Sequence, residues 1–406
     1  MTWQSGLPDL VAELSEVYRD LHQHPELSLR EFRTADLLAN ALRPLGFDVT
    51  TGVGGTGVVG VLRNGDGPVA MLRADIDALP VAEKTGLPYA STVRAVDDEG
   101  DEVPVAHACG HDMHATCLLG AATLLARSRD SWSGTALIVF QPAEEVALGA
   151  LNMIKDGLFE RFPKPDIVLG QHVSPLPAGM IGHGSGPLMA ATESVRVTLY
   201  GRGGHGSTPE LTVDPILMAA HVVVRLQGIV SREVPARERA VVTVGRLQAG
   251  TKDNIIPETA ELGINIRTFT DETRNTVHAA IERIVRAEAA ASGAPREPDL
   301  AWTAGTPVLA CDPEAAATTL AAFTRHFDQQ RLLAMQPVNA SEDVGVFGTA
   351  AGVPTVYWFF GGYDYAKHTF DQVPFNHSPE FAPDIEPTLS TGIEALIVAA
   401  LAWLAT

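Results

Sequence analysis

The sequence predicts an α/β fold in which a mostly parallel sheet is flanked by helices and a smaller α+β domain is inserted. Strand and helix patterns alternate toward both ends of the chain, and several strands, such as ALIVF at 136–140, are continuous apolar runs. Such runs are typical of parallel sheets that helices cover on both faces. Between about residues 186 and 293 the strands instead alternate apolar and polar positions, as in an antiparallel sheet with one covered face. We therefore expect one domain from residues 1–185 and 294–406, and an inserted domain from residues 186–293.

The individual elements follow from local periodicity and from turn signals. In the larger domain we expect helices at 8–21 and 30–45, glycine-broken strands between 53 and 62, a strand in VAMLRADIDALP, a helix after Asp112, the strand at 136–140, a helix at 150–162, the strand DIVLGQHV, a helix at 312–326, the strand PTVYWFFGG and a last helix from about 385. In the insert we expect the strand ESVRVTLYG, the helix DPILMAAHVVVRLQGIV, the strands AVVTVGRLQ and AELGINIRTF, and the helix TRNTVHAAIERIVRAEAAA. Asp112 is expected to be the N-cap of its helix. Polar motifs follow several strand ends, where open α/β sheets bind their ligands.

Composition restricts the class of partner. The chain has 406 residues, 46% of them hydrophobic, so it can bury the cores of two domains. Its formal net charge is −20 and its most basic stretch, at 232–239, alternates with Glu and Pro, so we expect no nucleic-acid partner. The apolar run at 396–405 is about half of the ~20 residues that a membrane span needs, so we expect no membrane insertion. Three cysteines without a signal peptide indicate a reducing compartment, and we expect a cytoplasmic location.

The densest group of possible metal ligands is HACGHDMHAT, at 107–116. It contains three histidines, one cysteine and one aspartate in a single strand-to-helix segment: His107, Cys109, His111, Asp112 and His114. Thiolate and imidazole suit zinc and its first-row neighbours. A lone histidine is more often a surface or capping residue, but this combination favours a metal. A structural zinc ribbon would need CxxC pairs, which Cys117 and Cys311 do not supply.

Two adjacent carboxylates follow the apolar strand at 136–140. They are Glu144 and Glu145, in QPAEE. An arbitrary pair of this kind is more often a solvated turn. A catalytic metal site, however, needs one carboxylate on the metal and another, held off it, to take a proton from water. Glu144 and Glu145 are suited to divide these roles.

Two further histidines and an acidic pair complete the candidates. His172 ends the strand of GQHV, and His377 lies in FNHSPEF near the C-terminal end. Each alone would be structural as readily as functional, although the strand-end position favours His172. Asp75 and Asp77, in RADIDALP, are suited either to orient a ligating histidine or to cap local backbone.

Taken in order, these motifs resemble a known enzyme family. RADIDALP, HACGHDMHAT, QPAEE, GQHV, GRGGHGSTP, NIIP and HSPEF are similar to those of the amidohydrolase branch of the aminoacylase and carboxypeptidase metallopeptidases, which includes hippurate hydrolases and indole-acetyl-amino acid hydrolases. The resemblance covers nearly the whole chain, and the combination of motifs is far more specific than any one of them.

The resemblance implies a two-metal centre that hydrolyses an N-acyl amino acid. Its metal ligands would be Cys109, His111, Glu145, His172 and His377. Glu144 would be the general base, and the insert would be a lid and dimerisation domain carrying His205, which in dimeric members polarises the scissile carbonyl in the partner subunit's site. Asn254 of NIIP would position the substrate, and Arg267 is a weaker candidate to bind a substrate carboxylate. A homodimer or higher homo-oligomer is therefore expected.

The sequence leaves several alternatives open. Many related peptidases have a histidine ligand and a bridging aspartate where this chain has Asp75 and Cys109, a change that the amidohydrolase branch shares and that leaves the role of Asp112 open. A dipeptidase or carboxypeptidase would use the same centre. A binding protein without turnover and a structural metal protein are further alternatives, and the glycines around His205 could simply form a hairpin. The two divalent ions could be Zn, Mn, Co or Ni, since the ligands exclude none of them.

Overall fold

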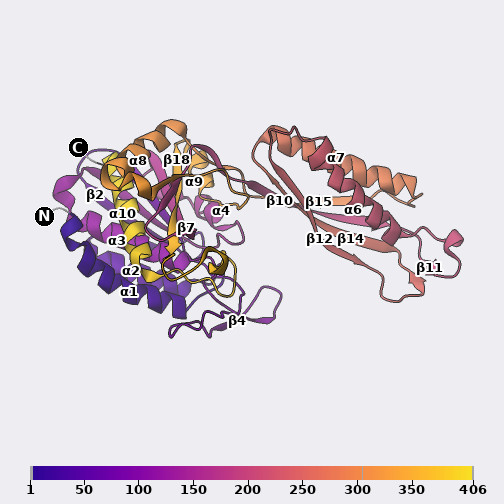
Figure 1. Cartoon of the computed structure of the whole chain (residues 1–406), viewed down its shortest axis with the longest axis horizontal. Coiled ribbons are helices and arrows are strands. Elements are labelled where there is room, and N and C mark those ends of the chain that lie inside the picture. Colours follow the sequence, from indigo (N-terminus) through magenta and orange to yellow (C-terminus); the bar gives the residue numbers. More distant parts are fainter. Residues whose placement is uncertain (1–2, 304, 405–406) are drawn as a thin grey trace. The chain divides into compact units, whose positions relative to one another are not determined.

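The computed structural model describes residues 3–303 and 305–404, which form two compact units (Figure 1). The first unit consists of Met1–Leu188, Ala310–Pro337 and Asp343–Thr406, and the second of Met189–Leu309 and Val338–Glu342. The sequence-based boundary at 293/294 differs from this division. Strand β15 (Asp299–Trp302) belongs to the second unit because it pairs antiparallel with β10 (Ala191–Tyr200) in the sheet of that unit.

The first unit is built on an eight-stranded mixed sheet with the order β1-β2-β6-β3-β7-β18-β8-β17. Its central neighbours β6, β3, β7 and β18 run parallel, and antiparallel pairs occur toward both edges. The strands of the unit are β1 (Asp48–Val53), β2 (Gly57–Asn64), β3 (Val69–Asp75), β6 (Gly134–Gln141), β7 (Ile167–Pro177), β8 (Ile181–His183), β17 (Leu332–Ala334) and β18 (Thr355–Tyr363), with a small hairpin of β4 (Arg94–Val96) and β5 (Glu102–Pro104). The α/β architecture with a mostly parallel sheet is confirmed.

Helices pack against this sheet through apolar stripes and buried faces. They are α1 (Leu7–Gln23), α2 (Phe32–Leu42), α3 (His111–Arg127), α4 (Gly149–Lys155), α5 (Leu158–Arg161), α8 (Pro313–His326), α9 (Gly345–Ala351) and α10 (Ile385–Leu404). In α1 the buried positions recur every three or four residues, whereas α3 is buried on nearly all sides. α3 and α10 approach closely at Gly120, where an added Cβ would lie 2.6 Å from the Cδ1 atom of Ile393. Among the described residues one helix, α10, is long and apolar enough to cross a membrane, but 67% of that window is buried inside the fold, as in a core helix.

Two local predictions for the first unit were wrong. Asp112 is not an N-cap: the helix begins at His111 after Gly110, whose φ of 85° is readily adopted by glycine. His111, Asp112 and His114 therefore lie in the first turn of α3. The helix predicted at 150–162 is instead two helices, because Gly157 adopts a left-handed φ of 84° between α4 and α5.

The second unit is a four-stranded antiparallel sheet with the order β12-β14-β10-β15. Its elements are β10, α6 (Pro215–Arg232), β12 (Ala240–Ala249), β14 (Thr259–Thr268), α7 (Asp271–Ala291) and β15, together with a small pair of β11 (Gly204–His205) and β13 (Ile255–Ile256). Burial alternates strictly along β14, and the inner faces of α6 and α7 share one apolar core with the sheet. The side chains of Asp214 and Thr270 accept backbone N–H groups at the starts of α6 and α7. β9 (Gly186–Met189) and β16 (Leu309–Cys311) form a separate two-stranded sheet.

Candidate metal centre

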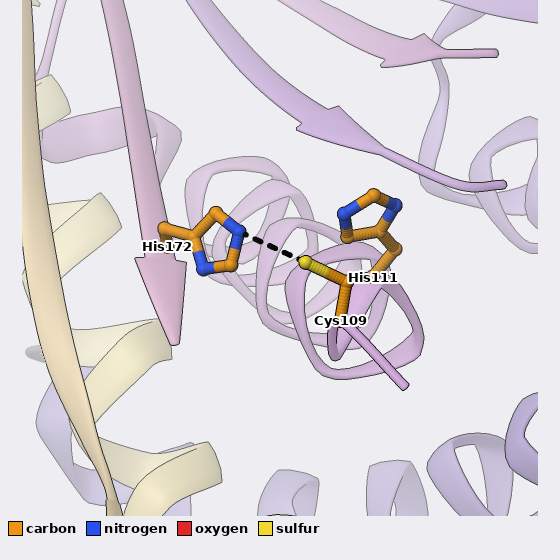
Figure 2. Close-up of side chains that lie close together, drawn as sticks. All are labelled: Cys109, His111 and His172. Atoms are coloured by element: carbon orange, nitrogen blue, oxygen red, sulfur yellow. Dashed lines mark hydrogen bonds between the residues drawn. The ribbon is translucent and has the colours of Figure 1, made fainter. Parts of the chain in front are cut away.

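The candidate ligands lie in or after strands of the large sheet, at the start of α3, and in the segment before α10. His172 lies in β7, and Glu145 follows β6. His111 is the first residue of α3 and Cys109 lies just before this helix, and Figure 2 shows the Cys109 sulfur directed at the imidazole of His172. His377 lies in the segment that precedes α10. Because β6, β3 and β7 are parallel neighbours, their carboxyl ends lie at one edge and bring these residues together.

The ligand atoms form two groups that share Cys109. In one group the atoms of Cys109, His111 and His172 lie within 4.8 Å of one another, and in the other those of Cys109, Glu145 and His377 do so. The Sγ atom of Cys109 is 3.5 Å from Nε2 of His172, and Oε2 of Glu145 is 3.5 Å from Nε2 of His377. The structure thus brings all five predicted ligands together.

The donor atoms fit a bound divalent cation. Nε2 of His111 and Oε1 of Glu145 are buried, and among the described residues neither has a hydrogen-bond partner. Buried polar atoms are normally paired, so two unsatisfied atoms 3.7 Å apart indicate a site for a ligand. Burial and the nearby charge of Glu145 raise the pKa of the Cys109 thiol well above its usual range. A cation in contact with the sulfur would stabilise the thiolate, which is the form that binds metals.

Asp77 orients the imidazole of His111. Nδ1 of His111 donates to Oδ1 of Asp77 at 3.2 Å, which leaves Nε2 directed toward Glu145. Oδ2 of Asp77 accepts the backbone N–H of Glu145 at 3.0 Å, so the same carboxylate holds two candidate ligands. Burial by itself would raise the pKa of Asp77, but the hydrogen bonds and charge of His111 hold it below its usual value. Such contacts fix the orientation of metal-ligating histidines.

Asp75 and His114, which form a further group of ligand type with His111, already make several hydrogen bonds. Nδ1 of His114 donates to Asp75 at 2.6 Å, and its Nε2 accepts the backbone N–H of Val173 at 2.8 Å. The other oxygen of Asp75 accepts from Arg73 at 2.8 Å. Both ring nitrogens of His114 therefore make hydrogen bonds, and His114 supports β7 at Val173, the residue after His172.

Arg73 is a buried residue of the site that the sequence reasoning missed. Its guanidinium group is 1% exposed and donates to Asp75, to Gln141 at 2.7 Å and to Asp343 at 3.1 Å. A signal was available, because Arg73 and Asp75 are two residues apart on a strand and therefore point to the same face. Its partner Asp343 lies far away in the sequence and carried no local signal.

Asp112, whose role the sequence left open, holds His22 of α1. Nδ1 of His22 donates to Asp112 at 2.6 Å, and Nε2 donates to Glu83 at 3.1 Å. Burial by itself would lower the pKa of His22, but these two carboxylates outweigh it and raise the pKa to about 10. Asp112 thus joins α1 to α3. His107 is 2% exposed and, within the described ranges, belongs to none of the groups suited to a metal.

Unusual backbone conformations occur at the candidate ligand His377 and directly before Glu144. The carboxylate of Glu144 shares a group with His111 and Glu145 in which the ligand atoms lie within 4.8 Å of one another. Ala143, directly before it, has a φ of 52°. His377 has a φ of 70°, and its N–H donates to the carbonyl of Ala108 at 2.6 Å. Left-handed non-glycine residues persist only where their surroundings hold them, which is typical of functional sites.

The remaining predicted residues lie in the second unit. His205 pairs with Ile255, and the backbone carbonyl of Asn254 accepts the N–H of Gly206 at 2.8 Å, so His205 and Asn254 are neighbours on exposed backbone. Nδ1 of His205 accepts the N–H of Ser207 at 3.1 Å, which places the proton of the neutral ring on Nε2. Arg267 lies in β14 and donates to the carbonyl of Asn339 at 2.6 Å and to Ser341 at 3.1 Å.

Several characterised proteins are similar to this chain. An N-acetyl-L-cysteine deacetylase of Bacillus subtilis is 37% identical over 88% of this chain and 82% of its own length. A hippurate hydrolase of Campylobacter jejuni is 42% identical over 70% of this chain and 72% of its own. A thermostable carboxypeptidase of Saccharolobus solfataricus is 35% identical over 93% of this chain and 92% of its own.

The same relationship is found in three dimensions. The crystal structure of a Bacillus subtilis protein, described as a dinuclear metal-binding peptidase of the M20 family, superposes with a TM-score of 0.79 and 30% identity over 97% of this chain and 99% of that one. The model of peptidase family M20/M25/M40 matches residues 71–398, which span every candidate ligand. The resemblance seen in the sequence motifs is thereby confirmed, and the chain belongs to peptidase family M20/M25/M40.

Proposed function

We propose that the protein is a metal-dependent amidohydrolase that cleaves the amide bond of N-acyl amino acids of the N-acetyl or N-benzoyl type. The single observation that carries this proposal is the double ligand group around Cys109 with the carboxylate of Glu144 beside it. A site for binding alone needs ligands but no additional base. The deacetylase and hippurate hydrolase relatives support the choice of substrate class.

The ligands proposed for two divalent ions are Cys109, His111, Glu145, His172 and His377, and the candidate ions are Zn, Mn, Co and Ni. When bound, such ions supply Lewis-acid stabilisation of negative charge and a water of lowered pKa. Cys109 belongs to both groups and would be a candidate ligand in each. Asp77 keeps the imidazole of His111 oriented for its ion.

Glu144 is proposed to handle the proton of the reaction. It takes a proton from the attacking water and delivers it to the leaving nitrogen, so the amine departs neutral. The carboxylate is half-buried and lies next to two ligands without being required as one. This arrangement suits a base that gains and loses a proton beside the ligands.

His205 is proposed to donate from Nε2 to the carbonyl oxygen on which negative charge develops. Its Nδ1 is occupied by Ser207, so Nε2 is the donor of the neutral ring. One such donor contributes on the order of 3 to 4 kcal/mol to transition-state stabilisation.

Asn254 and Arg267 are proposed to bind the substrate. We also propose that the 186–293 segment is a lid and dimerisation domain of a homodimeric cytoplasmic enzyme. Light scattering on the purified protein tests the dimer.

Hydrolysis of a substrate panel by the purified protein tests the function. The panel pairs N-acetyl and N-benzoyl amino acids with dipeptides, before and after chelation and with Zn, Mn, Co or Ni restored. We expect N-acyl amino acids to be cleaved, activity to be lost on chelation, and a restored metal to recover it. Preferential cleavage of peptides would support the alternative of a carboxypeptidase or dipeptidase, which the carboxypeptidase relative favours. Stoichiometric metal without turnover of any substrate would contradict the proposal.

A further inference from the structure

Glu31 is a fully buried carboxyl group that contacts the turn ahead of Glu144. Its side chain is 0% exposed. Oε1 accepts the backbone N–H groups of Leu29 and Ala143, each at 2.9 Å, and Oε2 accepts the hydroxyl of Thr56. These donors are all neutral, and burial raises the pKa of Glu31 to about 7. Burial of a carboxyl group is costly unless its oxygen atoms accept hydrogen bonds, and both oxygen atoms of Glu31 do so.

Both backbone donors belong to residues in the left-handed region. φ is 62° at Leu29 and 52° at Ala143. This conformation is strained for a residue other than glycine and persists only where the surroundings hold it. The carbonyl of Ala143 in turn accepts the N–H groups of Leu148 and Gly149, at 3.2 and 3.0 Å, and closes the turn that contains Glu144. The bond from Ala143 to Glu31 therefore holds the start of this turn.

The segment of Glu31 reaches the same turn at a second point. Ser28 donates its hydroxyl to Oδ2 of Asp77 at 2.7 Å. That oxygen also accepts the N–H of Glu145 at 3.0 Å. Ser28 and Glu31 thus hold the turn at its first residue and at the candidate ligand itself.

We propose that Glu31 is a positioning residue: its Oε1 atom sets the left-handed turn at Ala143, and with it the placement of Glu144 and Glu145. The expected effect on kcat rests on the function proposed above, in which displacement of the base Glu144 and of the ligand Glu145 slows proton transfer. Glu31 acts through the position of its Oε1 atom and not through its charge, since two backbone N–H groups need an acceptor oxygen at that point.

Two variants separate reach from charge. Glu31→Gln keeps the length and an acceptor oxygen but carries no charge, whereas Glu31→Asp keeps the charge and is one methylene shorter. We expect kcat to fall on the order of 100-fold in Glu31→Asp with KM changed by less than about three-fold, and to stay within about three-fold of wild type in Glu31→Gln. The visible absorption of Co²⁺-loaded protein reports the geometry around Glu145. It should change in Glu31→Asp and match wild type in Glu31→Gln.

Thr56→Val is the matched control, because it removes a bond to Oε2 and leaves Oε1 untouched. Its kcat and Co²⁺ spectrum should match wild type at a temperature well below the melting point of every variant. Equal losses in Glu31→Gln and Glu31→Asp, or none in Glu31→Asp, would overturn the proposal. Should Glu31→Asp not fold, Glu31→Gln decides: wild-type behaviour supports an acceptor role, and loss overturns it. If wild type cleaves nothing on the panel, the proposed function fails, and the Co²⁺ spectra alone decide the role of Glu31.

Discussion

At the scale of single residues, the carboxylates of the candidate centre differ in how many of their oxygen atoms already accept hydrogen bonds. Asp77 accepts from His111 and from the backbone of Glu145, and Asp75 accepts from Arg73 and His114, so every oxygen of these two carboxylates already accepts a hydrogen bond. Glu145 keeps an unsatisfied oxygen. The difference between a ligand and a supporting residue therefore lies in which oxygen atoms are already used.

Replacement of Glu144 by Gln tests the proposed base. The amide cannot take a proton from water, so kcat should fall by about 10² to 10⁴-fold. Metal content, measured by atomic absorption, should be unchanged, because the five proposed ligands are intact. Near-normal turnover with metal bound would exclude Glu144 from this role.

Replacement of Asp77 by Asn tests the support of His111. Loss of a contact that orients a ligating histidine typically weakens metal binding by about 10 to 100-fold, and we expect this range in competition with a fluorescent chelator. Asp112→Asn is the matched control, because it alters another buried carboxylate, which binds His22 and no candidate ligand. Its metal affinity should stay within about three-fold of wild type. Equal weakening by both substitutions would contradict the distinction between them.

At the scale of elements, a buried ionic network joins two helices to an irregular segment. His22 of α1 donates to Asp112 of α3 and to Glu83, and the two side chains of His22 and Asp112 are each about 1% exposed. α3 carries His111 in the same turn as Asp112. The network therefore joins α1 to the first turn of α3, whereas the imidazole of His111 itself is held by Asp77.

The His22 network predicts a pH-dependent stability. The folded pKa of about 10 lies above the ordinary value of 6.5, so the stabilisation is fully present below about pH 6.5 and is lost as the pH rises toward 10. The pKa values of Asp112 and Glu83 are lowered, so both stay ionised throughout this window. In urea unfolding of metal-free protein, wild type should lose about 1.4 kcal/mol per pH unit more than His22→Gln between about pH 7 and pH 9. Parallel pH curves for the two proteins would count against a charged His22.

At the scale of the whole molecule, each unit has its own apolar core. The core of the first unit lies between the eight-stranded sheet and its helices, and that of the second unit between its four strands, α6 and α7. The candidate centre contributes only a small group of polar atoms beside the first core. Burial of apolar surface is thus the main stabilising contribution in each unit, and we expect the fold to persist without a metal.

Removal of metal should abolish the hydrolytic activity without unfolding the protein. We expect chelation to abolish hydrolysis while the far-UV circular dichroism and the gel-filtration volume remain those of the loaded protein. A structural metal protein would instead unfold, because its binding free energy is its folding free energy. Loss of helical signal on chelation would thus favour that alternative over a catalytic centre.

Much of the architecture was predictable, because buried and exposed positions produce a periodic pattern of apolar and polar residues in the sequence. The continuous apolar runs of β6 and β18 and the strict alternation of β14 correspond to strands buried on both faces and on one face. Helix ends were less predictable, because they depend on single glycines such as Gly110 and Gly157 in left-handed conformations. The expected boundary at 293/294 left β15 outside the insert, because four residues carry too little periodicity to indicate their pairing partner.

The sequence by itself determined the α/β class, the chemical types of the candidate ligands and the motifs that identify the family, since these are properties of local segments. Only the tertiary structure decided which of the neighbouring residues His107, His111 and His114 keeps a free ring nitrogen at the centre. It also decided that Asp112 holds His22 and that Glu31 holds Ala143. These contacts join segments far apart in the chain, and they form only when packing brings those segments together.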